Sequence, residues 1–242
     1  MASLRIALYG TGRMGSAIAA IAEQRGHRIT QRISSANAGT APTDADVAIE
    51  FSRPDQALGN MRLCLKAGVP VVVGTTGWYD HLPAVQALVA EHRGSLLWAS
   101  NFSIGVNLLF QVNRMLAGLM DRQPQYRGEL LEIHHIHKLD APSGTALTLA
   151  RDIDLRHHGY SGWHLQEGPD VAGPAPSLPV RALREGEVPG THEVSWTSDE
   201  DRLTIRHEAF GRTGFATGAV VAAEWLQGRS GLFTMQDVLG LG

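Results

Sequence analysis

The stretch Leu4-Arg5-Ile6-Ala7-Leu8-Tyr9-Gly10-Thr11-Gly12-Arg13-Met14-Gly15 decides the fold. Residues 4–9 form a short aliphatic run typical of a strand, and the glycines that follow have the spacing G-x-G-x-x-G. An Ala- and Ile-rich segment over residues 16–25 predicts a helix, and residues 27–33 predict a second strand. The three elements make a βαβ unit with its glycines between the first strand and the helix.

Glycines at these positions are what a dinucleotide requires from such a turn. The first permits a tight turn, the second lets a pyrophosphate approach the backbone, and the third lets the helix pack on the strand. The alternative is an ordinary glycine-rich turn, but the surrounding βαβ pattern favours nucleotide binding.

The alternation of strands and helices continues to residue 103. Strands are expected over residues 46–51, 69–73 and 95–99, with helices over 55–67 and 82–92 between them. This pattern predicts an α/β fold with a Rossmann-type, doubly wound parallel sheet. Ligands bind such sheets beyond the carboxyl ends of the strands. Four segments are predicted at those ends: Gly10–Gly15, Ser52–Pro54, Gly74–Gly77 and Ser100–Ser103.

The pattern changes after residue 103. Helices are expected over residues 106–120 and 145–158. The Gly- and Pro-rich residues 159–179 predict a long loop that serves as a lid or an oligomer contact. An apolar helix over residues 214–227 needs a surface to cover it, and we expect it to pack back on the first domain.

Three alternating segments of the second half predict antiparallel strands joined by short turns: residues 180–184, 190–196 and 203–207. The chain is therefore predicted to have two domains. Residues 1–103, completed by residues 213–242, form a dinucleotide-binding domain. Residues 104–212 form an α+β domain with a mixed or antiparallel sheet, for substrate binding and oligomerisation.

Titratable side chains are concentrated in residues 129–146, where a predicted strand leads into a turn that opens a helix. Because a strand alternates faces, His134 and Lys138 are expected on one face, and His135 and His137 on the other. The helix N-terminus that follows can present backbone N–H groups to an anion. Imidazole, ammonium and anion-binding turn together predict a site for an acidic substrate.

A metal cluster and a plain polar strand face are the alternative interpretations of these histidines. Alternation argues against a metal, because the adjacent His134 and His135 point apart and no carboxylate or cysteine repeat supplies a ligand set. We therefore predict no metal site.

The composition argues against several classes of protein. A formal net charge of −3 over 242 residues offers no basic surplus for nucleic acid. No apolar run approaches the ~18 residues of a membrane span, and the first ten residues predict a strand, not a signal peptide. The single cysteine, Cys64, excludes an internal disulfide framework and is expected to lie in the core. We predict a cytoplasmic protein without nucleic-acid or membrane partners.

The end of the second strand usually selects between NAD and NADP. An acidic residue there binds the ribose 2′-hydroxyl of NAD, whereas a basic one accommodates the 2′-phosphate of NADP. The stretch Gln31-Arg32-Ile33-Ser34-Ser35 contains no carboxylate. Arg32 and the two hydroxyls favour NADPH over NADH, and Arg13 could also reach a phosphate. A solvated edge charge is the alternative role of Arg32.

With both halves considered, the chain resembles the 4-hydroxy-tetrahydrodipicolinate reductase (dihydrodipicolinate reductase) family of lysine biosynthesis. The resemblance rests first on the long and specific motif His134-His135-Ile136-His137-Lys138-Leu139-Asp140-Ala141-Pro142-Ser143-Gly144-Thr145-Ala146. Further segments extend it over nearly the whole chain: residues 12–15, 51–54, 74–78, 101–107, 184–192 and 231–239.

The resemblance implies hydride transfer from NADH or NADPH to a cyclic unsaturated dicarboxylate, which gives tetrahydrodipicolinate in the diaminopimelate route to lysine. Reducing a conjugated C=C–C=N system also requires a proton, which a general acid supplies. The resemblance assigns His134 as catalytic acid/base, Lys138 as proton donor and His135 as a substrate-binding residue. It also implies that Gly144 and Thr145 hold a substrate carboxylate.

The resemblance further implies a homotetramer, formed through the antiparallel strands of the second domain, and a set of nucleotide-binding positions. The matching positions are Gly10, Thr11, Gly12, Arg13, Met14, Gly15, Gly74, Thr75, Thr76, Ala99, Ser100, Asn101 and Phe102, to which the strand-end argument adds Arg32.

The chain departs from the family pattern at the ribose end of the nucleotide site. Its glycine loop is the short form instead of G-x-x-G-x-x-G, residues 33–46 are compressed, and the acidic residue after the second strand is missing. Two other functions are weighed against the reductase. A two-domain dehydrogenase of the aspartate/homoserine type would lack the motif of residues 134–146, and a non-catalytic dinucleotide sensor would need no acid at Lys138.

Overall fold

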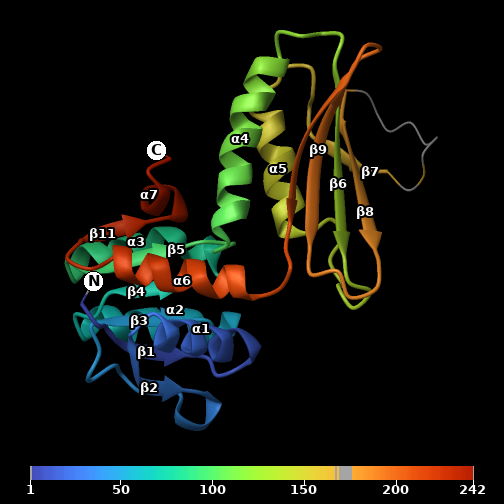
Figure 1. Cartoon of the computed structure of the whole chain (residues 1–242). Helices are drawn as coiled ribbons and strands as arrows, with labels where there is room; N and C mark the ends of the chain where they lie inside the picture. The colour runs from blue at the N-terminus through green and yellow to red at the C-terminus, as the bar shows by residue number, and fades with distance from the viewer. Residues whose placement is uncertain (1, 167, 169–175, 242) are drawn as a thin grey trace. The chain divides into compact units, whose positions relative to one another are not determined.

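The computed structural model describes residues 2–166, 168 and 176–241, and it divides into two compact units. Unit 1 comprises residues 1–104 and 212–242, and unit 2 comprises residues 105–211. Each unit has its own sheet and its own hydrophobic core (Figure 1).

In its described residues, unit 1 contains a six-stranded parallel sheet in the order β11-β5-β4-β3-β1-β2. Because the chain runs from β1 to β2 on one side and then to β3 on the other, the strand order reverses between β1 and β3. A ligand is expected beyond the strand ends at such a switch point. The strands are β1 (Arg5–Tyr9), β2 (Arg28–Ile33), β3 (Val47–Glu50), β4 (Val71–Val73), β5 (Ser95–Trp98) and β11 (Gly231–Phe233).

Helices cover both faces of this sheet, because successive strand residues point to opposite sides. Ile6 and Leu8 of β1 join a core with α1 (Arg13–Gln24) and α6 (Thr213–Trp225). Ala7 and Tyr9 join a second core with α2 (Pro54–Lys66) and α3 (Leu82–Glu91), which also buries Cys64. The predicted doubly wound fold is confirmed, and α6 packs on the first domain as expected. The remaining elements of unit 1 are the short helices η1 (Ser35–Asn37), η2 (Tyr79–His81) and α7 (Met235–Leu239).

The described residues of unit 2 contain a mixed five-stranded sheet in the order β10-β9-β6-β8-β7. Strands β10, β9 and β6 are antiparallel neighbours, whereas β8 and β7 run parallel to β6. The expectation of antiparallel pairing was therefore wrong for residues 180–184. A helix returns the chain after β6, so β7 and β8 run in the direction of β6. The strands are β6 (Arg127–His134), β7 (Trp163–Leu165), β8 (Leu178–Arg184), β9 (Thr191–Thr197) and β10 (Arg202–Glu208).

Helices α4 (Ile104–Met120) and α5 (Gly144–Asp154) supply the other half of the unit 2 core. Strand β6 alternates between partly exposed and buried residues, and its buried side chains include Leu130, Glu132 and His134. Leu130 belongs to the core under the helices. The alternation therefore places Glu132 and His134 on the helix-covered face of the sheet.

Two predicted segments differ from the structure. Helix α5 ends at Asp154, four residues before the predicted end. The predicted loop over residues 159–179 includes β7 and the first residues of β8, and its residues 167 and 169–175 lie outside the described residues.

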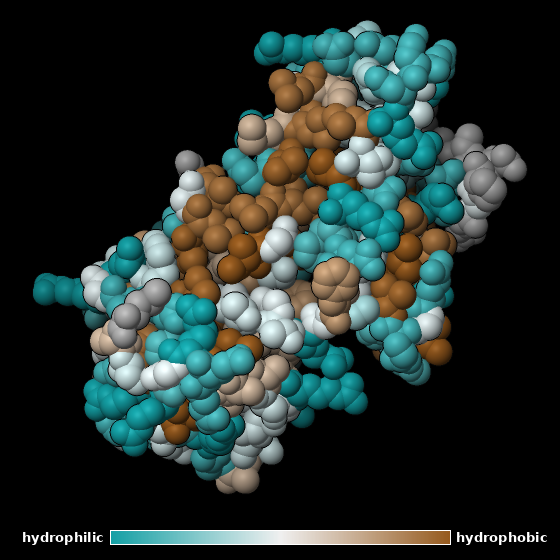
Figure 2. All heavy atoms as spheres, viewed as in Figure 1, coloured by the Kyte–Doolittle hydropathy of each residue, from teal (hydrophilic) through white to brown (hydrophobic). Residues whose placement is uncertain are grey.

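Apolar side chains are also found on the surface, as Figure 2 shows. On α4, Leu108, Val112, Met115 and Leu119 are between 45% and 65% exposed. None of the helices in the described part of the chain has both the length and the apolar character that crossing a membrane requires.

Candidate active site

A cavity of about 410 Å³ lies at the carboxyl ends of β1, β2 and β3 in unit 1. It is therefore at the switch point of the parallel sheet, where this class of fold binds ligands. Three segments contribute its walls: the glycine turn after β1, the residues after β2 and the start of α2. The lining residues are Tyr9, Gly10, Thr11, Gly12, Ile33, Ser34, Ser35, Ala38, Phe51, Ser52, Arg53, Asp55, Gln56 and Asn60.

The glycine turn has the geometry that a dinucleotide pyrophosphate needs. Gly10 has φ +96°, and a Cβ there would lie 2.1 Å from the carbonyl oxygen of Phe51. A Cβ on Gly15 would lie 1.9 Å from the carbonyl oxygen of Gly10, so only glycine allows the helix this close to the turn. A Cβ on Gly12 would meet nothing within 4 Å, and no side-chain hydrogen bond caps the N-terminus of α1 at Gly12. The open turn and the N–H groups of the first helical turn fit a bound phosphate.

The other predicted cofactor residues follow β4 and β5 at the same edge of the sheet. Gly74 is tightly packed, because a Cβ there would lie 2.1 Å from the ring of Phe51. Thr75 is buried, and its Oγ1 has no hydrogen-bond partner among the described residues. Phe102 is buried against the Phe51 ring, with centroids 5.5 Å apart. Thr76 and Ser100 are exposed, Ala99 is buried, and Asn101 accepts a hydrogen bond from the Ser103 N–H at 2.8 Å.

Arg32 does not line the cavity. Its guanidinium is 3.4 Å from Oε1 of Glu23 on α1. Arg53 does line it, together with Ser34 and Ser35, and its Nε is 3.1 Å from Oδ1 of Asp55. Arg53 was predicted to lie at the carboxyl ends of the strands, but no cofactor role was predicted for it. Arg13 is exposed at the start of α1, and Met14 packs against the core.

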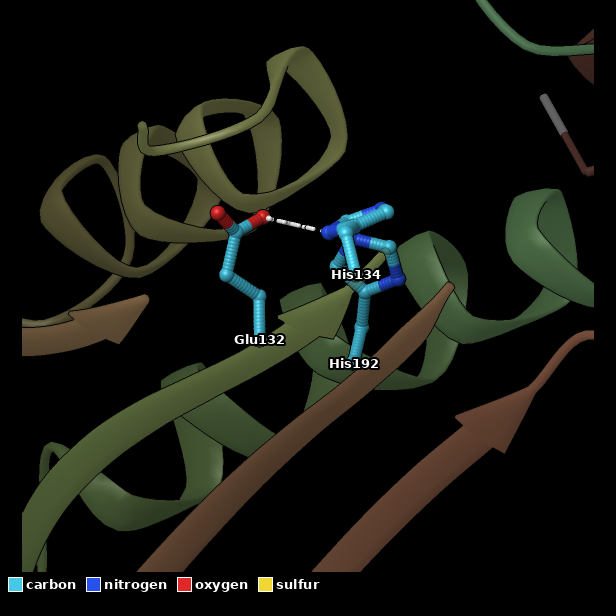
Figure 3. A group of neighbouring side chains, drawn as sticks. All are labelled: Glu132, His134 and His192. Carbon is cyan, nitrogen blue, oxygen red and sulfur yellow. Dashed lines mark ion pairs between the residues drawn. The ribbon is translucent and has the colours of Figure 1, made fainter. Parts of the chain in front are cut away.

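In unit 2 the end of β6 brings together three buried side chains, Glu132, His134 and His192 (Figure 3). Glu132 is directly opposite His192 in the antiparallel pairing of β6 with β9. Oε2 of Glu132 is 3.5 Å from Nδ1 of His134 and 3.7 Å from Nε2 of His192. Nδ1 of His134 has no hydrogen-bond partner among the described residues.

The Glu132 carboxylate has no exposed surface, and its oxygens are partnered from two further elements. The backbone N–H of Ser143, which caps the N-terminus of α5, is 3.0 Å from both oxygens. Nη2 of Arg184, the last residue of β8, donates to Oε1 at 3.2 Å. The hydroxyl of Ser143 is 3.2 Å from Nε2 of His192.

Burial lowers the pKa of both histidines. Desolvation lowers the pKa of His134; the negative charge of Glu132 opposes this, while the positive charges of Lys138 and Arg184 add to it. Desolvation and the neighbouring histidines lower the pKa of His192 to about 3.

Lys138 is not on the strand face predicted for it. Strand β6 ends at His134, the last residue that pairs with β8, and its pairing with β9 ends one residue earlier, at Ile133. Lys138 lies in a turn closed by its own N–H to the carbonyl of His135 at 3.1 Å. Its Nζ contacts both carboxylate oxygens of Asp140, at 2.8 and 2.9 Å, and the side chain is 21% exposed.

The loop that carries Lys138 is attached to β8 through Arg184. Nε of Arg184 donates to the carbonyl of Lys138 at 3.3 Å, and Nη2 donates to the carbonyl of Asp140 at 2.5 Å. Burial alone would raise the pKa of Asp140, but the hydrogen bond from Lys138 and the nearby positive charges bring that pKa below its usual value. The loop is therefore held by these charged contacts and by the Ile136 N–H, which donates to the carbonyl of Gly186 at 3.1 Å.

The other predicted substrate residues are at the two ends of this loop. His135 follows β6 and is half-buried, and His137 is exposed with Nε2 3.1 Å from Glu187. Gly144 and Thr145 are the first residues of α5, as predicted, and a Cβ on Gly144 would meet nothing within 4 Å. This helix start has space on its outer side for an anion.

The group of Glu132, His134 and His192 also meets the first geometric requirement for a metal, since one ligand atom of each lies within 4.8 Å of the others. The sequence argument against a metal assumed that no carboxylate accompanied the histidines, and the structure shows that this assumption was wrong. However, Glu132 already accepts hydrogen bonds from Ser143 and from the Arg184 guanidinium. A cation would have to share this carboxylate with Arg184, so the arrangement suits proton positioning better than metal binding.

Sequence reasoning missed Glu132, Arg184 and Ser143 as parts of this site. Glu132 could have been found, because it is two residues before His134 and must share its face. Arg184 begins one of the segments that carry the resemblance, but its contact with Glu132 could not be predicted, because it depends on the parallel pairing of β8 with β6.

Comparison with known proteins agrees with this architecture. Residues 4–102 match the model for the dihydrodipicolinate reductase N-terminus, and residues 105–239 match that for the C-terminus. The chain belongs to the dihydrodipicolinate reductase family. It is 43% identical over 238 residues to the 4-hydroxy-tetrahydrodipicolinate reductase of Christiangramia forsetii, covering 98% of both chains. It is 38% identical over 208 residues to the enzyme of the same name from Neisseria meningitidis, covering 84% of this chain and 75% of that one.

Solved structures show how far the fold is shared. A dipicolinate-bound dihydrodipicolinate reductase from Paenisporosarcina sp. TG-14 has a TM-score of 0.77 at 21% identity, covering 96% of this chain and 98% of that one. A probable dehydrogenase from Thermotoga maritima has a TM-score of 0.57 at 10% identity, covering 97% and 92%. The fold therefore extends beyond the family, and the residues at the end of β6 have to explain the chemistry.

Proposed function

We propose that the chain reduces 4-hydroxy-tetrahydrodipicolinate to tetrahydrodipicolinate with NAD(P)H, in the biosynthesis of lysine. The observation that carries this proposal is the arrangement at the end of β6. There a buried imidazole, a lysine loop and an anion-binding helix start meet in a chain of the dihydrodipicolinate reductase family. The dehydrogenase and sensor alternatives do not account for this arrangement.

The reaction replaces a hydroxyl by hydrogen, so it consumes one hydride and one proton and releases water. NAD(P)H supplies the hydride when bound, and the chain has to supply the proton. His134 and Lys138 are the proposed acids, because both nitrogen-bearing side chains lie at the end of β6 and a positioned acid accelerates such a step ~10²–10⁴-fold. Asp140 holds the Lys138 ammonium in place through two contacts.

The substrate carries two carboxylates, and the site offers positive partners for them. The start of α5 presents backbone N–H groups at Gly144 and Thr145, with open space outside Gly144. His135 lies at the other end of the same loop. We propose that these three residues orient the dicarboxylate beside His134 and Lys138.

We propose NADPH as the preferred cofactor in unit 1, and the absence of an acidic residue after β2 supports this preference. Arg32 can reach a 2′-phosphate only by leaving Glu23, and both partners of this pair are about half exposed. Arg53 already lines the cavity and is therefore the stronger candidate for the same contact.

We further propose that the chain forms a homotetramer through the sheet of unit 2. Strand β10 is an edge of this sheet in the described residues, and most of its residues are exposed, including Leu203. An exposed edge strand is a surface that another chain can cover. Sedimentation should give the mass of four chains of 26.1 kDa each. The cytoplasmic location stays a prediction.

The function is tested by following nicotinamide oxidation, with substrate generated in situ by the preceding synthase of the pathway. His134→Gln and Lys138→Met are each expected to lower kcat by ~10² or more, the range of general acid–base catalysis. Both variants should bind NADPH as the wild type does, because the nucleotide cavity is in unit 1. Wild-type turnover in both variants, or no reduction by the wild-type chain, would overturn the proposal.

A further inference from the structure

We propose that Glu132 is a positioning residue that links the proton donor to the substrate-carboxylate site, with Arg184 as its partner. This inference rests on the proposed function, because it assigns to Glu132 a role in positioning the proposed acid His134 and the proposed anion site at the start of α5. Glu132 itself has no exposed surface, so it acts through the side chains and backbone that it contacts.

Glu132 contacts groups on β6, β8, β9 and at the start of α5, and it is linked to the lysine loop through Arg184. Its oxygens accept the N–H of Ser143, directly before the first residue of α5. The same carboxylate is 3.5 Å from the His134 ring on its own strand and 3.7 Å from His192 on β9. From β8, Arg184 donates to Glu132 and also to two carbonyls of the lysine loop. One carboxylate thus connects the imidazole, the anion-binding helix start and the loop that carries Lys138.

Stability alone does not account for a carboxylate in this position. A buried ion pair contributes little net stability, because the desolvation of both charges offsets their attraction. Glu132 is on the strand face that elsewhere carries core residues such as Leu130, where an apolar side chain would fit the pattern. A charge at this point instead sets the field at His134 and orders the groups around it.

The groups facing Glu132 determine what its removal should do. They are His134 on β6, Arg184 on β8, His192 on β9 and the Ser143 N–H of α5, with Lys138 and Asp140 beyond Arg184. The Glu132 charge favours the imidazolium form of His134, whereas Lys138 and Arg184 oppose it. Removing that charge therefore lowers the pKa of His134 further. The pH above which turnover falls should move to a lower value if protonated His134 is the active form.

The test compares Glu132→Gln with Glu129→Gln, the same substitution three residues earlier on the same strand, where the side chain is half-buried and off the His134 face. Glu132→Gln is expected to lower kcat at least tenfold, to raise KM for the dicarboxylate, and to shift the alkaline limb of the kcat profile to lower pH. Glu132→Asp, which keeps the charge, should restore the position of that limb. Glu129→Gln should behave as the wild type.

Folding is followed by circular dichroism and cofactor binding by NADPH fluorescence. If Glu132→Gln does not fold, the comparison is made with Glu132→Asp instead. A wild-type kcat and pH profile in Glu132→Gln, with His134→Gln inactive, would overturn the role of Glu132 and leave the proposed function standing. The role of Glu132 would also be overturned if Glu132→Gln lost kcat without a shift of the alkaline limb of its pH profile. The same holds if Glu132→Asp did not restore the position of that limb. Recovery of Glu132→Gln turnover by added Zn²⁺, or wild-type turnover that a chelator abolishes, would replace proton positioning with a metal role.

Discussion

Gly190→Ala is expected to lower turnover by moving the His134 ring, although Gly190 has no side chain of its own at the site. Gly190 comes directly before β9, with φ +153°, and a Cβ there would lie 3.0 Å from Nε2 of His134 and 3.3 Å from its Cδ2. The opposite edge of the ring, at Nδ1, is 3.5 Å from Glu132. The imidazole therefore has little room to retreat without approaching the carboxylate.

The size of the effect follows from these distances. Ordinary contacts of a Cβ begin at 3.4 Å, so the His134 ring must move by about 0.4 Å, the difference between 3.4 and 3.0 Å. A misplacement of about 1 Å can lower turnover by ~10², so a shift of this size should lower kcat on the order of tenfold. The backbone conformation adds strain of ~1–3 kcal/mol to the free energy of folding.

Gly186→Ala is the matched control for that strain. Gly186 is in the same connection between β8 and β9, has φ +46°, and has nothing within 4 Å of an added Cβ. It should lose ~1–2 kcal/mol of stability and keep its kcat. The assay is steady-state nicotinamide oxidation at saturating substrate, with urea unfolding measured in parallel. Equal losses of kcat in the two variants, or a wild-type kcat in Gly190→Ala, would show that the position of the His134 ring does not limit turnover.

Two further predictions concern His192 and the nucleotide cavity. His192 has a folded-state pKa of about 3, below its ordinary 6.5, so the unfolded chain takes up its proton first and stability falls as pH drops from about 6.5 towards 3. Between pH 7 and 5 the wild type should lose about 2 kcal/mol more unfolding free energy than His192→Asn; equal losses in urea titrations would contradict this burial. In the nucleotide cavity, Arg53→Ala should lower the ratio of kcat/KM for NADPH to kcat/KM for NADH at least tenfold. Arg32→Ala should lower this ratio less. The reverse order would assign the 2′-phosphate to Arg32.

The parallel sheet of unit 1 could be predicted because its information is local. The glycine turn after β1 and the alternating strands and helices each follow from short windows of sequence. The position of α5 was predicted for the same reason, and the anion site at its start stays a prediction. The partners of β8 could not be predicted, because strand order depends on where α5 returns the chain, and no local pattern encodes that path.

The residues around His134 show where alternation stops being informative. Alternation puts His134 on the same face as Leu130 and Glu132, and the structure shows that this face is buried. It fails for Lys138, because the strand ends at the last paired residues, His134 with Arg184 on β8. A sequence window cannot show where the pairing with β8 and β9 ends.

The two proposed proton donors are consequently held by different means. His134 is fixed by strand pairing and by the close approach of Gly190, so its position follows from the sheet. Lys138 is in a turn whose carbonyls at Lys138 and Asp140 both accept from Arg184. Since Arg184 also donates to Glu132, the charge that faces His134 and the contacts that hold the lysine loop depend on the same guanidinium. Any movement of Arg184 must therefore change both donors together, although they belong to different elements of the fold.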